Sequence, residues 1–501
     1  MAQFVKIDPA KLTALHNVDP SLVSYNVEMT EVTGGTFWKS YTPGQVAGTE
    51  KFPPVTSALD MAGMTEWFDP IDTTNPRLIK LAKDLGPAWI RCSGTWATKT
   101  YYDFEGKGSV PEGFENRLTK EQWLNLLDFV DAVGGKLLIS VANCQGLHST
   151  EEPWNPSQAE LIFNLSKEHG HAIDAVEFTN EPNMMTPTGF PEDYHPVHFR
   201  RDEDIFHKWV RENHPETLIV GPCTCDPTVL QMGPDEKKCG AGIADVVPAC
   251  STDELLEGCT EKMDVFSYHY YNGVSERMES VMPTAHWEEK DADGEAYLST
   301  AGRIARAYAP LRDKYVPGGQ MWVTESGDAG GGGNTWASTY LDVLRTLNEL
   351  GEFASVTDGV IFHNTLASSD YGYLKHGTFE PRPNYFAVLL WNTLMGTTVY
   401  NTNEPIREGA HVFCHSRKDG KEGFAYLIIN NSKTETTTVE LPKDADRYTL
   451  DGNGNLRSTV MYLNGKPLTL GENDELPALT PVKQPAGTVE LAPSSCTFFV
   501  L

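Results

Sequence analysis

The sequence predicts an α/β protein: a (β/α)8 TIM barrel with a C-terminal antiparallel β-sandwich. Three observations carry this prediction: short apolar segments rich in β-branched residues, amphipathic stretches between them, and alternating apolar and polar residues after Gly396. Near-continuous apolar strands joined by helices indicate a parallel sheet covered on its outer face. Eight such units in about 370 residues are typical of a closed barrel.

The eight expected strands have the short length and apolar character of buried strands. In chain order they cover residues 22–28, 88–92, 136–142, 174–180, 217–222, 263–269, 320–325 and 357–363.

The expected helices between them carry apolar residues at helical spacing. Thr119 and Gln122 form a capping-box pattern at the start of one helix. Pro156 is expected at the first position of the next. The other expected helices cover 201–213, 296–314, 335–350 and 384–395.

Three parts of the chain are expected. Residues 1–15 contribute a strand, around Phe4–Ile7, to the β-sandwich; residues 16–396 form the catalytic barrel; residues 397–501 form the sandwich. In the last part, turns rich in Asn, Gly, Asp and Pro separate short alternating runs, as in antiparallel sheets.

The charge balance limits the partners. Forty Lys and Arg face 69 Asp and Glu, a net charge of −29, which repels nucleic acid and anionic membranes. A densely sulfated polysaccharide is disfavoured too, unless a local basic groove exists; Arg200, Arg201 and Lys208 are the nearest candidates. The chain start lacks a signal-peptide pattern, which leaves a cytoplasmic protein or the mature part of a secreted one open. The oligomeric state stays open.

The nine cysteines do not predict a metal site. Five of them, Cys223, Cys225, Cys239, Cys250 and Cys259, are close in sequence but contain no CxxC pair. Free thiols are the preferred interpretation, and one disulfide within this group stays open. No metal or other cofactor is expected.

Polar residues end seven of the eight expected strands, where a barrel has its active site. Capping of loops and helices is the alternative for any one of them. The candidates at the strand ends include Glu28, Thr95, Asn143, Asn180, Glu181, His269, Tyr271 and Glu325.

Glu181 in VEFTNEPN and Glu325 in MWVTESG follow the fourth and seventh apolar strands. These strands lie on opposite sides of an eight-stranded barrel, so their ends face each other across its mouth. Two facing carboxylates are the equipment for glycoside hydrolysis, with one group protonated and the other ionised. Asn180 can bond a sugar 2-hydroxyl. A salt bridge under a loop is the alternative for either glutamate alone.

Asn-Glu-Pro after the fourth strand, with Glu after the seventh, resembles the large clan of retaining (β/α)8 glycosidases. Nearly the whole chain resembles a finer group, the heparanase and β-glucuronidase family, glycoside hydrolase family 79. That resemblance implies a barrel plus a sandwich built from both chain ends. It rests on LGPAWIRCSGT, VEFTNEPN, FSYHYYNG, TESGDAGGGG and DYGYLKHGTFEPRPNYFAVLLWNTLMGTTV.

The resemblance also implies residue roles. Glu181 corresponds to the general acid/base, Asn180 to the partner of the 2-hydroxyl, and Glu325 to the nucleophile. The backbone amides of Gly331 and Gly332 and the hydroxyl of Tyr371 correspond to the site for the glucuronate carboxylate; glycine amides can converge on an anion without a Cβ in the way. Further substrate-side matches are Tyr271, His269 and Thr95, while Glu28 stands where mammalian heparanases have Asp.

Heparan-cleaving members line a groove with Lys and Arg, whereas the stretches NCQGLHSTEEPW and CTCDPTVLQMGPDE are acidic or neutral here. The long segment 29–70 carries Phe37, Trp38, Tyr41, Trp67 and Phe68, and it either walls off one end of the cleft or serves as a packing flap. We therefore expect a retaining exo-β-glucuronidase that releases terminal glucuronic acid, with or without a 4-O-methyl group. The alternatives are an endo-β-glucuronidase acting within glycosaminoglycan chains and a non-catalytic carbohydrate-binding protein.

Overall fold

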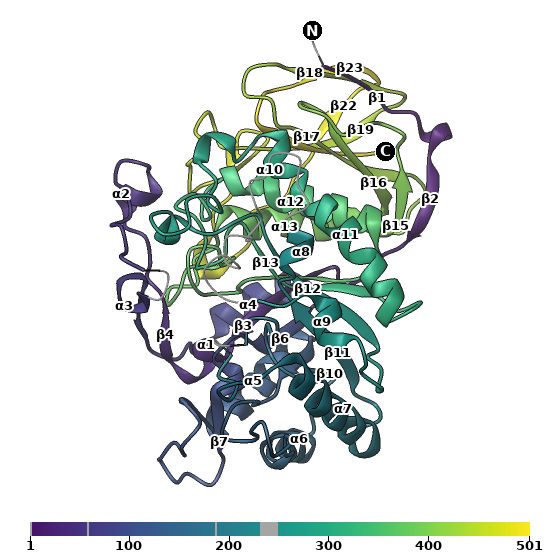
Figure 1. The fold of residues 1–501 in the computed structure, drawn as a ribbon. Helices are drawn as coiled ribbons and strands as arrows, with labels where there is room; N and C mark the ends of the chain where they lie inside the picture. The colour runs from purple at the N-terminus through teal and green to yellow at the C-terminus, as the bar shows by residue number, and fades with distance from the viewer. Residues whose placement is uncertain (1–2, 58–59, 186–187, 231–248) are drawn as a thin grey trace.

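The computed structural model describes residues 3–57, 60–185, 188–230 and 249–501. Its centre is a closed barrel in which the strands follow the order β10-β11-β12-β13-β14-β3-β6-β9, and every pair in it is parallel. The predicted barrel is thereby confirmed. In Figure 1 the β-rich C-terminal part, in yellow-green, lies at one end of the molecule and the barrel occupies the rest.

All eight expected segments supply barrel strands. Their bounds are β3 Val23–Glu28, β6 Trp89–Ser93, β9 Lys136–Ser140, β10 Ala175–Glu177, β11 Leu218–Thr224, β12 Val265–Tyr271, β13 Met321–Gly327 and β14 Ile361–His363.

The barrel has an apolar core and a polar mouth. Trp89, Ala175 and Trp322 belong to a buried apolar cluster contributed by barrel strands, and the two tryptophan rings lie 4.8 Å apart. Successive residues of a strand alternate between its two faces. Arg91 lies two positions after Trp89 on β6, and Glu177 lies two positions after Ala175 on β10, so each shares a strand face with the apolar residue before it; both are buried. The inner face of the barrel therefore changes from apolar to charged toward the carboxyl ends of the strands.

The outer helices agree with the sequence pattern in place and differ at their ends. Helix α5, Lys120–Val133, has the expected capping box of Thr119 and Gln122. Helix α6, Ser157–His169, starts one residue later than expected and has Pro156 as its N-cap. The remaining long helices are α4 Pro76–Asp84, α7 Pro196–Asn213, α11 Thr300–Tyr315, α12 Leu341–Val356 and α13 Pro383–Leu394.

Helix α12 begins six residues later than the expected start at 335. The backbone amides of Tyr340 and Leu341 donate to the carbonyls of Ser458 and Leu456, at 2.9 and 2.8 Å. The backbone amides at the start of α12 are therefore hydrogen-bonded to the C-terminal part. Helical periodicity in the sequence does not reveal such contacts, so it could not place this start.

The C-terminal part consists of two sheets that enclose an apolar cluster. Both chain ends contribute: β1, Gln3–Lys6, pairs with β18, Thr437–Leu441, and β2, Thr13–Asn17, pairs with β15, Met395–Asn401. The β1–β18 pair is parallel, unlike the antiparallel pairing expected throughout; no hairpin joins these strands, so no turn constrains their direction. The remaining bounds are β16 His411–Arg417, β17 Phe424–Asn430, β19 Ala445–Asp451, β20 Tyr462–Leu463, β21 Lys466–Pro467, β22 Val482–Gln484, β23 Gly487–Leu491 and β24 Ser495–Val500.

Buried polar contacts join the barrel and the sandwich. The ring of His411, on β16, lies 2.7 Å from Asn348 Oδ1 of α12 and 2.8 Å from Glu295 Oε1. Within the described residues, no helix is long and apolar enough to cross a membrane.

Candidate active site

The two predicted carboxylates meet at the mouth of the barrel. Glu325 lies on β13, and Glu181 lies four residues beyond the end of β10, with a left-handed backbone φ of 45°. Between them stands His269 of β12, whose Nδ1 is 3.0 Å from Glu181 Oε1 and 3.6 Å from Glu325 Oε2. These two oxygens therefore lie at most 6.6 Å apart, the sum of 3.0 and 3.6 Å.

Three donors converge on the carboxylate of Glu325. Arg91 Nη1 donates to Oε2 at 3.3 Å, and the Tyr271 hydroxyl donates to Oε1 at 2.5 Å. Asn364 Nδ2 also lies 3.4 Å from Oε1. A full charge and two neutral donors suit a carboxylate that must be ionised in order to attack.

Glu181 has the surroundings of a proton donor. Burial raises the pKa of its carboxyl above the usual range, opposed by a hydrogen bond from the Cys225 thiol and by the Arg91 charge. Burial also lowers the pKa of His269 to about 4, so this ring is neutral at neutral pH. Arg91 Nη2 lies 3.3 Å from His269 Nε2 and can only donate, so the proton of the neutral ring is on Nδ1, facing Glu181.

Arg91 organises the floor of the site. Its Nε donates to Glu177 at 3.0 Å and its Nη2 to Asn180 Oδ1 at 2.8 Å. Asn180 Nδ2 thereby faces outward and reaches Thr95 Oγ1 at 3.5 Å. In the sequence, Arg91 is marked by being a charged residue inside the apolar strand segment AWIRC.

The glycine loop presents free amides. Within the described residues no hydrogen bond is made by the N–H of Gly331 or Gly332, whereas their carbonyls accept from Ser275 and Ser369 at 2.9 and 3.0 Å. Both glycines have φ near 90°, and a Cβ on Gly332 would stand 2.5 Å from the Cβ of Trp38. Glycine is therefore required here, and the two amides are available to an anion.

Arg277 supports this loop from below, and sequence reasoning missed it. It is fully buried, donates to the carbonyls of Gly331 and Gly333 at 3.2 and 2.9 Å, and pairs with Asp370 at 2.7 Å. Its guanidinium lies 3.8 Å from the ring centre of Tyr41. No motif marks Arg277, because it acts through residues far away in the sequence.

Tyr371 is connected to Glu325 through one amide. Asn364 Nδ2 lies 3.0 Å from the hydroxyl oxygens of both Tyr371 and Tyr271. Since the Tyr371 oxygen accepts from Asn364, its own proton is available to a ligand. Burial raises the pKa of this hydroxyl well above its usual value and keeps it a donor.

The remaining predicted residues differ in their positions. Glu28 is buried, and burial followed by the Glu325 charge raises the pKa of its carboxyl well above the usual range. Thr95 is half-buried beside Asn180. Asn143 is fully buried, and its side-chain amide has no hydrogen-bond partner in the described part of the chain.

Segment 29–70 lies against the glycine loop. Its strands β4, Gly35–Trp38, and β5, Thr65–Phe68, form a hairpin. Phe37 and Tyr41 are buried, and the Tyr41 hydroxyl donates to the Gly333 carbonyl at 2.9 Å, whereas Trp67 is 71% exposed. The segment therefore packs on the glycine loop and leaves one large aromatic side chain in solvent.

Glu181, Cys225 and His269 place three potential ligand atoms within 4.8 Å of one another. The His269 nitrogen that faces Glu181 carries a proton, because Arg91 donates to the other nitrogen, and a protonated nitrogen cannot bind a metal. The three side chains thus form a hydrogen-bonded set. The eight cysteines in the described residues are free thiols; Cys239 lies outside those residues.

The basic residues that follow the fourth strand do not line an open cationic groove. Arg201 bonds Asp202 at 2.7 Å and two backbone carbonyls at 2.8 Å. Arg200 donates to the Glu254 carbonyl at 2.6 Å, and Lys208 lies 3.9 Å from Glu212. Part of the stretch after the fifth strand, residues 231–236, lies outside the described residues.

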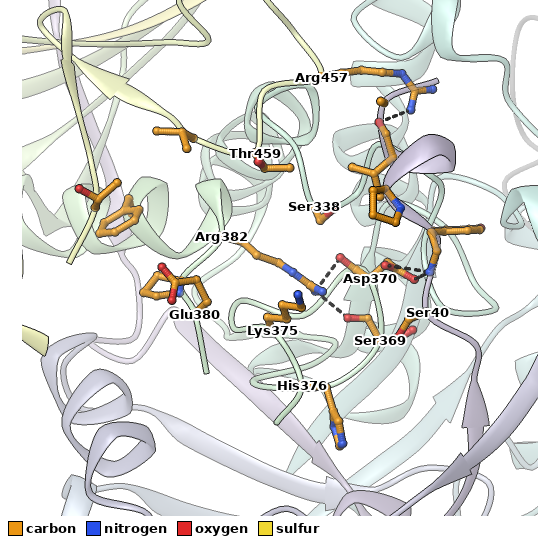
Figure 2. Close-up of a pocket in the computed structure, with 18 of the residues that line it drawn as sticks. Ser40, Ser338, Ser369, Asp370, Lys375, His376, Glu380, Arg382, Arg457 and Thr459 are labelled. Atoms are coloured by element: carbon orange, nitrogen blue, oxygen red, sulfur yellow. Dashed lines mark hydrogen bonds between the residues drawn. The ribbon is translucent and has the colours of Figure 1, made fainter. Parts of the chain in front are cut away.

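A separate pocket of about 640 Å³ lies between the barrel-mouth loops and the sandwich. Figure 2 shows its wall, where Arg382 donates to the carbonyls of Ser369 and Asp370. Ser369 and Asp370, which precede Tyr371, line this pocket, whereas Glu181 and Glu325 do not. The pocket is therefore separate from the carboxylate pair.

No family model matches the chain. Heparanase-like protein 1 of Arabidopsis thaliana is 24% identical over 486 residues, covering 86% of this chain and 85% of that protein. The hyaluronoglucuronidase of Hirudo nipponia is 25% identical over 478 residues, covering 86% and 90%. The baicalin-β-D-glucuronidase of Scutellaria baicalensis is 28% identical over 250 residues, covering 48% and 46%.

Solved structures support the fold. A 4-O-α-L-rhamnosyl-β-D-glucuronidase from Fusarium oxysporum superposes with a TM-score of 0.62 at 12% identity, with all of both chains covered. A GH51 arabinofuranosidase from Xanthomonas axonopodis gives a TM-score of 0.62 at 14% identity with the same coverage. These structures support the fold alone. The resemblance of this chain to the heparanase and β-glucuronidase family, glycoside hydrolase family 79, is confirmed over most of its length by the curated relatives above.

Proposed function

We propose that this protein is a retaining exo-β-glucuronidase that releases terminal β-linked glucuronic acid. The observation that carries the proposal is the pair Glu181 and Glu325, joined through His269 at the barrel mouth, beside two free glycine amides and the Tyr371 hydroxyl. The names of relatives that act on glucuronides support the same substrate class.

The reaction follows from the surroundings of each carboxylate. Glu325 attacks the anomeric carbon and forms a glycosyl-enzyme ester, while Glu181 gives its proton to the leaving oxygen. Glu181, now ionised, takes a proton from water, which attacks the same carbon and frees Glu325. Retaining enzymes place their carboxyls about 5–5.5 Å apart and inverting ones about 6.5–9.5 Å; the limit of 6.6 Å between the two oxygens that face His269 lies at the lower end of the inverting range and is compatible with the proposed retaining arrangement.

Substrate recognition would lie at the glycine loop. The N–H groups of Gly331 and Gly332 and the hydroxyl of Tyr371 give three neutral donors for the C5 carboxylate. Asn180, oriented by Arg91, would bond the 2-hydroxyl. Neutral donors suffice because hydrogen bonds to a charged acceptor are shorter and stronger than neutral ones.

Endo-cleavage of an unsulfated glucuronate-containing chain is the second candidate. It is favoured by the hyaluronoglucuronidase among the relatives and by the acidic surface, which disfavours sulfate but tolerates a less charged polymer.

A product assay tests both candidates. Hydrolysis is measured on p-nitrophenyl β-glucuronide beside the glucoside, galactoside and xyloside, and then on hyaluronan and heparan sulfate. The exo-enzyme releases free glucuronate from the small glucuronide, whereas shortened oligosaccharides from the polymers would favour endo-cleavage. NMR should detect the β-anomer first; the α-anomer as first product would exclude a retaining mechanism.

A further inference from the structure

We propose that Cys225 is a positioning residue for the general acid/base. Its thiol and the His269 ring together occupy Oε1 of Glu181, and this leaves Oε2 as the atom that carries the proton to the leaving group. The inference rests on the proposed role of Glu181, and none of the motifs that carry the family resemblance includes this cysteine.

The chain places Cys225 through a local irregularity. The β11–β12 register shifts between Pro222 and Thr224, and Cys223 has a left-handed φ of 48°. A bulge of this kind redirects the side chains that follow it. Cys225 is thereby directed toward the loop that carries Glu181, 44 residues away in the sequence.

A side-chain amide then fixes the backbone of Cys225. Asn183 Oδ1 accepts from the Cys225 amide at 3.2 Å, and Asn183 Nδ2 donates to the Cys225 carbonyl at 2.8 Å. Asn183 is 1% exposed and lies two residues after Glu181, in VEFTNEPN. One buried amide thus ties the thiol-bearing residue to the acid/base loop in both directions.

Two donors meet on one oxygen of Glu181. The Cys225 thiol donates to Oε1 at 3.1 Å, and the His269 Nδ1–H lies 3.0 Å from the same oxygen. Within the described residues no hydrogen bond reaches Oε2, and the Glu181 side chain is 14% exposed. A protonated carboxyl holding two donors on Oε1 therefore carries its proton on Oε2.

The thiol also adjusts the acidity of Glu181. Burial raises the pKa of this carboxyl, and the hydrogen bond from Cys225 lowers it, ahead of the Arg91 charge. The titratable and charged groups that face Glu181 or its partners are Arg91 on β6, Glu177 on β10, Cys223 and Cys225 at the end of β11, His269 and Tyr271 on β12, and Glu325 on β13. Of these, Cys225 is the neutral donor whose removal leaves the catalytic pair and the substrate contacts in place.

The test compares Cys225→Ala and Cys225→Ser with the unaltered protein. Loss of the donor raises the pKa of Glu181, so the alkaline limb of kcat/KM for an activated glucuronide should move upward by about half to one pH unit in Cys225→Ala. In Cys225→Ala, kcat for a glucuronide with a poor leaving group should fall more than kcat for p-nitrophenyl glucuronide, because the Glu181 carboxyl is held less firmly in the orientation that gives its proton to the leaving oxygen. Cys225→Ser keeps a hydroxyl donor and should restore most of both.

Cys259→Ala is the matched control. The Cys259 thiol donates to another buried carboxylate, Glu203 Oε2, at 3.2 Å, on helix α7 of the outer layer. This variant removes the same kind of bond and should leave the pH profile unchanged. Thermal unfolding of each variant checks that it folds.

A substrate-free measurement separates this inference from the proposed function. The ¹³C NMR titration of the Glu181 carboxyl, assigned by its loss in Glu181→Gln, should move upward in Cys225→Ala and return in Cys225→Ser. If no glycoside is hydrolysed but this titration moves, the proposed function fails and the positioning stands. An unmoved titration, or an equal movement in Cys259→Ala, overturns the positioning role.

Discussion

Glu181 and Glu325 are the same residue type in different surroundings. Burial raises the pKa of Glu181, whereas Arg91, Tyr271 and Asn364 all donate to Glu325. The proposed division into acid and nucleophile therefore depends on neighbours that belong to other strands.

Glu325→Gln should lower kcat by about a thousandfold or more, because an amide cannot attack the anomeric carbon. Glu181→Gln should spare an activated aryl glucuronide more than an alkyl glucuronide, since a good leaving group needs little protonation. Steady-state rates on both substrates test this. Equal losses on the two substrates in Glu181→Gln would contradict its assignment as the acid.

Tyr371→Phe removes one donor to the substrate carboxylate and keeps the ring. The kcat/KM for p-nitrophenyl glucuronide should fall about tenfold or more, which corresponds to ~1.4 kcal/mol, while that for the glucoside changes little. Unchanged discrimination between the two substrates would show that the carboxylate is bound elsewhere.

At the scale of elements, the glycine loop depends on Arg277 below it. This side chain joins the carbonyls of Gly331 and Gly333 to Asp370 and packs on Tyr41. The hydrogen bonds from Arg277 thus hold the Gly331 and Gly333 carbonyls in the loop conformation that leaves the Gly331 and Gly332 amides free.

Arg277→Leu should raise KM for the glucuronide at least as much as Tyr371→Phe does, because the loop loses its support and Asp370 is left buried without its charge partner. It should also lower Tm by several degrees, since breaking a buried pair costs about 3–5 kcal/mol. Inhibition by free glucuronate, measured beside unfolding curves, separates the two effects. A destabilised variant that retains its affinity for glucuronate would assign Arg277 to folding alone.

Helix α7 contains a buried carboxyl that makes stability depend on pH. Burial raises the pKa of Glu203 to about 8, so the folded protein holds a proton that the unfolded chain releases near pH 4.5. Its contribution to stability is fully present below about pH 4.5 and is lost as the pH rises toward 8.

Glu203→Gln replaces this carboxyl by a neutral group of the same shape. The loss of Tm between pH 5 and pH 8 should be smaller in this variant than in the unaltered protein by a few degrees. Glu254→Gln, on an exposed capping residue, serves as the control, and an identical pH dependence in all three proteins would contradict the assignment.

At the scale of the whole molecule, the net charge of −29 bears on which polymers can approach the site. Sulfated chains carry dense negative charge, and repulsion acts over about a Debye length, ~8 Å at physiological salt. The arginines after the fourth strand bond Asp202 and backbone carbonyls, and their charges are already included in the net charge of −29.

Small β-glucuronides should therefore be hydrolysed much faster than heparan sulfate is shortened, and the little cleavage of heparan should increase with salt. The assay compares glucuronate release with size reduction by gel filtration at low and physiological salt. Efficient internal cutting of heparan sulfate with little activity on small glucuronides would replace the exo proposal by the endo alternative.

The sequence by itself determined the barrel, its eight strands and the residues at their carboxyl ends. Strand and helix periodicity is a local property, and in a closed parallel barrel it also determines which end of each strand reaches the mouth. The sequence therefore predicts Glu181, Glu325 and Asn180 as candidate site residues without any knowledge of their contacts.

Only the tertiary structure decided how those residues are held. Cys225 meets Glu181 across 44 residues and Arg277 meets Asp370 across 93, and neither pairing leaves a periodic signal in the chain. The bulge in β11, the left-handed φ of Glu181 and the turned carbonyls of the glycine loop set side-chain and amide directions that residue types alone do not encode. Asn143 shows the limit of a strand-end position: its side-chain amide is fully buried and has no hydrogen-bond partner within the described residues, so a place at a strand end does not by itself define the contacts of a side chain.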